Sequence, residues 1–564
     1  MTSFFDFTPR LASRWIALAA VAAALAFATL AHAENWVGYY EIRQDGRLIG
    51  AERVDFDDAA DGSYTVRTNG TLKQGEGKDE TTFSNLSELR ARAGGEFQDY
   101  QREVTVNKLP RKLAMQYDGT RFIAQVAVGK GAQEYKISAP STSIVTDLGI
   151  YGHLQLLVRS AVRDARLGRE IPILNPGELT KSTAVVDDRG PDSVKTAKGF
   201  FASRRFFVDM GTVGANVWTD TPGRMIRAEI PAIGVTVELQ NFTGPRAAEA
   251  APLRAKSERV DRADVSFPIK PKSGTDDTAM LHGVLRRPRG VAGRLPAVIF
   301  LSDTGPQSAD GVDPVTKLDT RTGDLCDAIA EGGFAVMSWD DRGVDRSPGD
   351  VAQTTLDTQT ADAKAAVRWL VARDDVDPAR VALVGLGEGG NVAWRVASAE
   401  SDVKAVVALA PAPVSMAKLA EEQARRRLST AADFLPEDLD DHPVMIALKK
   451  ARTTNEEFTV IGNRPTYLDL FRQWDRLDPA ADLAAVKVPV LHVLMGRDEQ
   501  VFPELSDAFA KKVGGRSNYT VKRFDALDHF LVRGRGTIGS YSDPDRRVDP
   551  EATAYIVRWL ATSM

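Results

Sequence analysis

Two patterns of hydrophobic and polar residues divide the chain. From residue 34 to about residue 242, short runs alternate apolar and polar positions, which is typical of half-buried antiparallel strands. Turn residues separate pairs of such runs at Gln44-Asp45-Gly46, Asp118-Gly119 and Pro222-Gly223. An amphipathic pattern over 152–162 predicts one helix among the strands. We therefore expect residues 34–243 to form a β-rich antiparallel domain, as a sheet or an open barrel.

After residue 262 the pattern changes to apolar strands that alternate with amphipathic helices. The predicted strands are 296–301, 334–339, 381–384, 405–409 and 488–494, and the predicted helices include 324–332 and 360–372. Such alternation indicates an α/β domain with a mostly parallel sheet and helices on both faces. The polar, alanine-rich segment 244–262 is the expected linker, so the second domain should cover 263–564.

Residues 411–478 interrupt this alternation. The segment is rich in charge, and its pattern predicts helices and no strand, as expected for a lid inserted over a site. Its acidic run, 437–441, lacks the spacing of a calcium-binding loop and fits a solvated surface. We call residues 411–478 the lid segment.

Length and charge narrow the possible classes of protein. The chain has 564 residues, which favours two domains over one. Its 72 basic and 77 acidic residues are spread along the sequence and give a net charge of −5. This distribution offers no basic patch for nucleic acid and no polybasic tract for anionic lipid.

The N-terminus carries the pattern of a secretory signal. Arg10 and Arg14 precede an apolar run over 15–31, and Ala31-His32-Ala33 provides small residues at a cleavage site. We expect cleavage after Ala33, export to the periplasm or beyond, and no stable membrane insertion afterwards. An uncleaved anchor is the alternative, because the run is near the lower limit for spanning a bilayer. The single cysteine, Cys326, cannot form an intramolecular disulfide and fits a buried apolar position.

Several segments of the C-terminal half carry motifs in a recognisable order. They are LSDTGPQ and DG within 301–311, GFAVMSWDDRGVDRSPG at 333–349, PARVALVGLGEGGNV at 378–392, GRDEQV at 496–501 and DHF at 528–530. Together they resemble the motifs of exported bacterial α/β-hydrolases of the serine carboxylesterase type, some of which carry a β-rich N-terminal domain. The resemblance covers about 263–564.

The resemblance implies hydrolysis of an ester, or of an amide or thioester, through an acyl-enzyme. The nucleophile, acid and base positions would be Gly387, Asp498 and His529, in the chain order of this fold. The oxyanion would be held by backbone N–H groups near Asp303 and Thr304 and at Glu388. A small acyl ester or acyl-like ligand is implied. The sequence has no HExxH motif, no paired histidines and no cysteine cluster, so we expect no metal ion and no cofactor.

Gly387 departs from this pattern, because the family carries a serine there. Glycine adopts the strained backbone of the turn at little cost but supplies no nucleophile. Loss of the serine of a triad costs on the order of 10⁶ in kcat. Asp303 and Thr304 also stand where the family prefers Gly and Ser, and a positive φ at Asp303 would misplace an oxyanion donor. The sequence thus predicts an impaired or inactive pseudo-hydrolase.

Three alternatives remain open at this stage. Ser302, or a water activated by His529, would replace the missing nucleophile in an active hydrolase. The spacing Gly385-x-Gly387-x-x-Gly390 also fits a dinucleotide-binding turn, but no acidic residue follows the strand at 405–409. Finally, the β-rich domain would bind an envelope ligand or a protein partner, with the hydrolase half as its scaffold.

Overall fold

The computed structural model describes most of the chain after the predicted signal. Its described residues are 35–75, 80–107, 109–129, 131–147, 149–220, 223–250, 256–270, 278–429, 436–461 and 464–564, without the side chains of 436–438 and 464. The predicted signal at 1–33 lies outside them. The described residues of Met1–Gly211 and Ala215–Ala251 form one compact unit, and those of Thr212–Gly214 and Pro252–Met564 form another.

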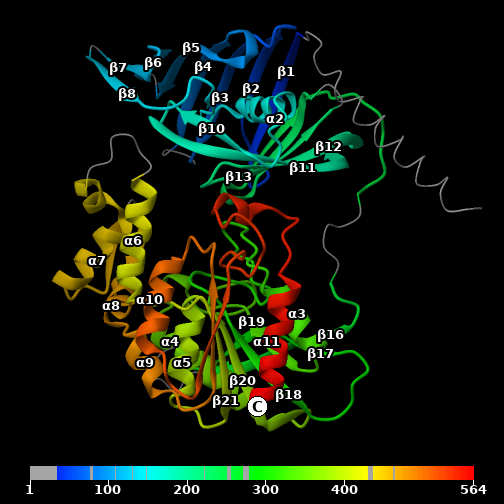
Figure 1. The fold of residues 1–564 in the computed structure, drawn as a ribbon, viewed down its shortest axis with the longest axis vertical. Helices are drawn as coiled ribbons and strands as arrows, with labels where there is room; N and C mark the ends of the chain where they lie inside the picture. Colours follow the sequence, from blue (N-terminus) through cyan, green and yellow to red (C-terminus); the bar gives the residue numbers. More distant parts are fainter. Residues whose placement is uncertain are drawn as a thin grey trace, which may run out of the picture. The chain divides into compact units, whose positions relative to one another are not determined.

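The N-terminal unit is built on one sheet of 15 strands (Figure 1). The strands are β1 (Trp36–Gln44), β2 (Arg47–Asp58), β3 (Tyr64–Gln74), β4 (Thr81–Ala91), β5 (Phe97–Val106), β6 (Leu109–Tyr117), β7 (Phe122–Val128), β8 (Gly131–Ile137), β9 (Ile144–Val145), β10 (Glu170–Asn175), β11 (Thr180–Thr196), β12 (Gly199–Asp209), β13 (Gly214–Thr219), β14 (Met225–Ile230) and β15 (Val235–Leu239). Strands β1 to β8 and β10 to β15 form two meanders, which join where Tyr40 of β1 pairs with Leu239 of β15. The β9–β10 pair is parallel.

Turn chemistry and one helix explain much of this unit. The hairpin β1–β2 closes at Asp45-Gly46, and β6–β7 closes around Asp118-Gly119, as the sequence predicts. Helix α2 (Leu154–Arg163) follows a short 3₁₀ turn (Tyr151–His153) and buries its apolar side chains. The alternating strands and this helix therefore share one core.

The C-terminal unit is built on a sheet of eight strands with the order β16-β17-β19-β18-β20-β21-β24-β25. They are β16 (Val260–Ile269), β17 (Ala279–Pro288), β18 (Leu295–Leu301), β19 (Ala335–Trp339), β20 (Val376–Leu386), β21 (Val403–Leu409), β24 (Val490–Met495) and β25 (Tyr519–Phe524). Strands β16 and β17 pair antiparallel, and the strands from β19 to β25 run parallel. The central strands are apolar throughout, because helices cover both faces.

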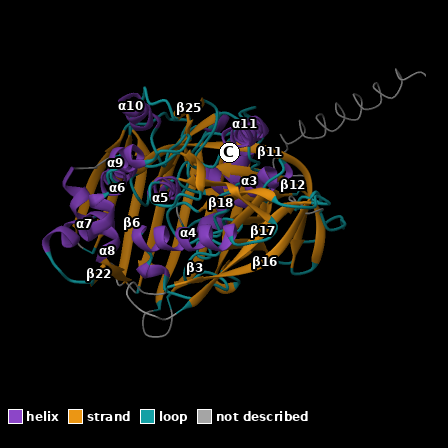
Figure 2. Cartoon of the chain, turned by 90° about the horizontal axis from the view of Figure 1, so that it is seen from below, coloured by secondary structure: helices purple, strands orange, loops and turns teal. Residues whose placement is uncertain are grey.

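Helices form the outer layers of this unit (Figure 1). They are α3 (Thr322–Glu331), α4 (Leu356–Val371), α5 (Glu388–Ala397), α9 (Pro479–Ala485), α10 (Pro503–Val513) and α11 (Pro550–Ser563). Helices α3 and α11 pack together on one face, whereas α4, α5 and α9 pack on the other. Among the described α-helices, only α2 (Leu154–Arg163) belongs to the N-terminal unit; Figure 2 draws the helices in purple.

The lid segment contains a strand pair that the sequence prediction missed. The segment contains three helices, α6 (Met416–Leu428), α7 (Pro443–Thr453) and α8 (Leu468–Arg476), as the sequence predicts. These helices pack together. Strands β22 (Phe458–Ile461) and β23 (Arg464–Tyr467) form a hairpin between α7 and α8. The prediction of no strand is wrong because the apolar alternation over 458–461 is too short to stand out among charged residues.

The predicted linker 244–262 overlaps the sheet. Strand β16 begins at Val260, which is buried and pairs with Pro288 of β17. Its buried positions alternate with Arg262 and Asp264, so the apolar signal is diluted by charge. The sheet of the C-terminal unit therefore starts inside the segment that its composition marks as a linker.

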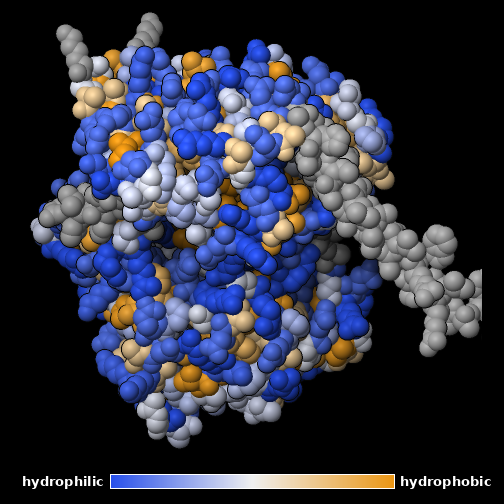
Figure 3. Space-filling view, turned by 45° about the horizontal axis from the view of Figure 1, so that its top comes forward, coloured by the Kyte–Doolittle hydropathy of each residue, from blue (hydrophilic) through white to orange (hydrophobic). Residues whose placement is uncertain are grey.

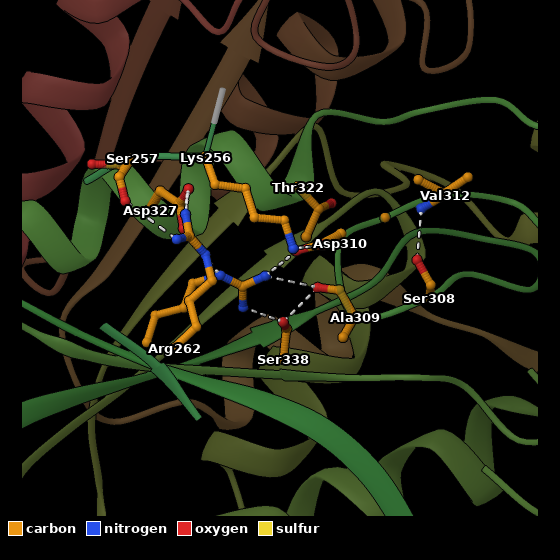
Figure 4. Close-up of polar contacts among 12 residues, drawn as sticks. Lys256, Ser257, Arg262, Ser308, Ala309, Asp310, Val312, Thr322, Asp327 and Ser338 are labelled. Atoms are coloured by element: carbon orange, nitrogen blue, oxygen red, sulfur yellow. Dashed lines mark hydrogen bonds and ion pairs between the residues drawn. The ribbon is translucent and has the colours of Figure 1, made fainter. Parts of the chain in front are cut away.

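A buried arginine anchors the loop that follows β18, and its partners Ala309, Asp310 and Ser338 are labelled in Figure 4. Arg286 is fully buried, donates to Oγ of Ser338 at 2.7 Å and to the carbonyl of Ala309 at 3.4 Å, and pairs with Asp310. Its Nε lies 3.2 Å from Oδ1 of Asp327. Because a buried charge is tolerated only with partners, this cluster fixes the loop around 308–312 against the sheet.

The surface shows no single dominant apolar area on the face in Figure 3, which is mainly hydrophilic with separate hydrophobic groups. Exposed large apolar residues are distributed over both units, for example Leu109, Val315 and Val460. Within the described chain, none of the helices combines the length and hydropathy needed to cross a membrane.

Candidate active site

The turn between β20 and α5 has the geometry of a nucleophile elbow. Gly387 lies between them with φ 51° and ψ −121°, and its N–H donates to the carbonyl of Leu409 at 2.9 Å. A Cβ at Gly389 would overlap the backbone of 301–302, and one at Gly385 would overlap the backbone of Gly389. The glycines let strand, helix and loop approach closely, and the turn persists without a nucleophilic side chain.

The predicted acid and base meet at the ends of two neighbouring strands. Asp498 follows β24 and His529 follows β25, and Nδ1 of His529 lies 2.8 Å from Oδ2 of Asp498. The other oxygen of Asp498 accepts from the N–H groups of Gln500 and Val501 at 2.8 and 2.7 Å. Both side chains are 1% exposed. The carboxylate is thus fixed by the backbone and orients the imidazole, as in a catalytic triad.

The loop that carries His529 is held by its neighbour Asp528. Oδ1 of Asp528 accepts from the N–H groups of Phe530 and Val532 at 2.9 and 3.0 Å. Its Oδ2 accepts from Arg546 at 2.9 Å, and both side chains of this pair are buried. The sequence prediction did not assign a role to Asp528 or Arg546, because the pairing partner lies on a later loop with no motif of its own.

The carboxylate of Asp303 occupies the place that the missing serine would take. Its Oδ2 lies 3.0 Å from Nε2 of His529, and its Oδ1 accepts from the N–H of Glu388 at 3.1 Å. A Cβ built on Gly387 would overlap this carboxylate. The positive φ of the loop falls at Gly305 (φ 93°) and not at Asp303, so the predicted strain at Asp303 is absent. Asp303 therefore enters the site through its side chain, which the sequence prediction did not consider.

Two carboxylates flank His529 and change its protonation. Burial by itself lowers the pKa of His529, but Asp498 and Asp303 outweigh burial and raise the pKa well above its ordinary value. The two carboxylates therefore favour the cationic imidazole, which directs one N–H to each of them. In this state it is a proton donor and not the base that serine hydrolysis requires.

Glu388 connects the elbow to the lid segment. Its side chain is buried, and one carboxyl oxygen accepts from Nε1 of Trp474 on α8 at 3.1 Å and from the hydroxyl of Thr304 at 3.4 Å. Burial and the nearby charge of Asp303 raise the pKa of Glu388 to about 7. Thr304 thus contributes its side chain to this contact.

Ser302, the predicted substitute nucleophile, is directed to a different partner. Its hydroxyl donates to Asp341, with oxygen–oxygen distances of 3.0 and 3.2 Å. Asp341 also accepts from the N–H of Gln307 at 2.9 Å, and burial raises its pKa to about 8. Both ring nitrogens of His529 are already engaged by Asp498 and Asp303, so this geometry does not activate Ser302. Ser302 and Asp341 instead fix the loop that presents Asp303.

Two observations bear on a dinucleotide or a metal ion at this site. The backbone N–H of Glu388, where a dinucleotide phosphate would be expected, is taken by Asp303. Among the described residues, no three His, Cys, Asp or Glu side chains are grouped to hold a metal ion.

Part of the C-terminal unit is similar to a known family of hydrolases. Residues 319–534, which contain the elbow, Asp498 and His529, match the family model described as serine aminopeptidase, S33. The strand–glycine turn–helix arrangement and the order of the three positions are those expected of one fold. The C-terminal unit has the α/β-hydrolase fold.

Relatives of the α/β-hydrolase unit are distant. Esterase EstD of Thermotoga maritima is 26% identical over 283 residues, which are 50% of this chain and 65% of that protein. The chain therefore spans somewhat less than two thirds of this relative. An uncharacterized 31.7 kDa Escherichia coli protein is 23% identical over 224 residues, which are 37% of this chain and 78% of that protein. The alignment with a solved esterase of Pyrococcus furiosus covers 54% of this chain and 92% of that chain, at 19% identity and a TM-score of 0.37.

Proposed function

We propose that this protein is an exported, esterase-like α/β-hydrolase in which serine-dependent ester hydrolysis is disabled. One observation carries the proposal: the carboxylate of Asp303 lies over Gly387 and takes both the N–H of Glu388 and Nε2 of His529. The first of these groups would hold the oxyanion of an ester substrate, and the second would accept the serine proton. A small acyl ester is the ligand that the esterase similarity supports, and it would have to compete with Asp303 for both groups.

Two assays of the unaltered protein test the loss of serine chemistry. We expect no labelling by a fluorophosphonate probe. We also expect the protein to hydrolyse short and medium acyl nitrophenyl esters no faster than the His529→Ala variant does. The surface variant Asp374→Asn is the matched control, because Asp374 is exposed and lies away from these groups in the sequence. Stoichiometric labelling that maps to Ser302, with His529-dependent turnover, would contradict the proposal and support the substitute nucleophile.

Export rests on the N-terminal pattern alone. We expect protein recovered from cells to begin at Glu34, which N-terminal sequencing would reveal. A protein that begins at Met1 and sediments with membranes would instead support the uncleaved anchor. The predicted ligand or partner of the β-rich unit stays a prediction.

A further inference from the structure

The two oxygens of Asp303 lie at two functionally different positions. Oδ1 receives the N–H of Glu388 at 3.1 Å, and Oδ2 faces Nε2 of His529 at 3.0 Å. In acyl transfer the first position stabilises a developing oxyanion, and the second belongs to the nucleophile. An ester formed through Oδ2 would therefore have Oδ1 as its carbonyl oxygen, already bonded to an oxyanion donor.

Small molecules from solvent reach Asp303 before they reach His529. The side chain of Asp303 is 13% exposed, whereas that of His529 is 1% exposed. The two residues after Asp303 are exposed, and nothing lies within 4 Å of the position where Gly305 would carry a Cβ. The first reactive group that an incoming electrophile meets is thus a carboxylate.

We propose that Asp303 is a nucleophile that opens epoxides, and that the chain hydrolyses them to diols. An epoxide suits this site because ring opening produces an alkoxide that needs a proton and releases no separate leaving group. Water supplies that proton, because the ring oxygen leaves the carbon on the side opposite Oδ2, whereas Nε2 of His529 lies beside Oδ2. This inference shares with the proposed function the placement of Asp303 over Gly387.

The first step forms one bond and breaks one. A lone pair of Oδ2 attacks an epoxide carbon, the carbon–oxygen bond of the ring breaks on the opposite side, and the ring oxygen takes a proton from water. The hydroxide that remains takes the Nε2 proton of His529, because Asp303 has become a neutral ester. The products are a hydroxyalkyl ester of Asp303 and a neutral imidazole. Asp498 remains a positioning residue, because it holds Nδ1–H at 2.8 Å and keeps the ring oriented.

The second step returns the site to its starting state. Neutral His529 removes a proton from water, and the hydroxide attacks Cγ of Asp303, which places the negative charge on Oδ1 at the N–H of Glu388. The intermediate expels the diol, whose new alkoxide is protonated by the imidazolium. The resulting carboxylic acid then gives its proton to His529. The sum is epoxide plus water to diol, with the aspartate and imidazolium regenerated.

The proposal also accounts for Gly387. Any side chain at this position would overlap the Asp303 carboxylate. The glycine at the elbow and the aspartate on the oxyanion loop therefore form one matched change, in which the nucleophile moves from the turn to the loop opposite. If the residues at 303 and 387 had changed independently, nothing would explain why the Asp303 carboxylate occupies the space that Gly387 leaves open.

A single turnover in water labelled with oxygen-18 tests the proposal on the unaltered protein. With protein in excess over styrene oxide, and in parallel over propylene oxide, we expect a diol product and one heavy oxygen in the peptide that contains Asp303. Attack of water on Cγ is the source of that label. Label in the diol alone would overturn the proposal, because Asp303 would then act as a base, and so would the absence of diol with both epoxides.

Variants test the intermediate. We expect His529→Gln to accumulate an adduct on Asp303 of the mass of one epoxide, because the second step lacks its base. Asp303→Ala should give neither adduct nor diol, and Asp374→Asn should behave as the parent. If His529→Gln does not fold, the oxygen-18 result still decides. Serine-type labelling at Ser302 would refute the proposed function, whereas an unlabelled Asp303 with no esterase activity would refute only this inference.

Discussion

Gly387→Ser alone will not restore ester hydrolysis, whereas Gly387→Ser combined with Asp303→Gly will raise kcat/KM by about 10³-fold or more over the parent. The serine Cβ of the single variant overlaps the Asp303 carboxylate, and Nε2 of His529 remains bound to that carboxylate. Removal of Asp303 clears the N–H of Glu388 and lets His529 accept the serine proton. The assay is hydrolysis of short acyl nitrophenyl esters under identical conditions.

His529 provides the control for this restoration. Adding His529→Ala to the double variant should return the rate to that of the parent. Fluorophosphonate labelling should appear only in the variant that combines Gly387→Ser with Asp303→Gly. Only that variant has a serine at 387 and no carboxylate between the serine and His529. A single Gly387→Ser variant as fast as the double variant would show that Asp303 leaves the site without cost. Inactivity of both variants would mean that the oxyanion donors themselves are misplaced.

Much of the fold followed from local patterns. The apolar runs before Gly385 and Asp498 are long enough to mark buried strands, and the glycines at the elbow mark a strand–helix turn. Because parallel strands present their carboxyl ends at one edge, residues that follow β20, β24 and β25 meet there. Motif order was therefore sufficient to bring Gly387, Asp498 and His529 to one place.

The role of Asp303 could not be read from the sequence. Its two partners, Glu388 and His529, lie 85 and 226 residues away, and no local pattern encodes the direction of its side chain. The sequence prediction treated Asp303 as a poor substitute for glycine on a strained loop. The positive φ lies instead at Gly305, which leaves Asp303 an unstrained backbone and a carboxylate free to turn into the site.

The architecture of the β-rich unit was likewise only partly predictable. Hairpin turns such as Asp118-Gly119 define neighbouring strands, but they do not say whether the last strand returns to the first. Here β1 pairs with β15, so two meanders join at the middle of one sheet. That pairing depends on contacts about two hundred residues apart, as between Tyr40 and Leu239, which turn chemistry does not specify.

Asp303→Asn will lower the pKa of His529 and change how stability depends on pH. In the parent the pKa of His529 is raised well above 6.5, so its contribution to the free energy of unfolding is complete below about pH 6.5 and is lost as pH rises through the raised value. Asparagine keeps the shape of Asp303 but removes the charge that faces Nε2. The loss of stability with rising pH should therefore be smaller in the variant and should end at a lower pH, although it begins near pH 6.5 in both proteins.

Histidine NMR separates this effect from the titration of Glu388. The charge of Asp303 also contributes to the raised pKa of Glu388, after burial, so Asp303→Asn lowers the pKa of both groups and urea unfolding between about pH 6 and about pH 9 reports their sum. Nitrogen-15 labelling of histidine, with His529→Gln to assign the signal, follows His529 alone. His492, whose pKa burial lowers to about 3, serves as an internal reference that stays neutral. An unchanged His529 titration in Asp303→Asn would mean that Asp303 does not face the imidazole in solution, and it would remove the basis for both the disabled serine chemistry and the carboxylate nucleophile.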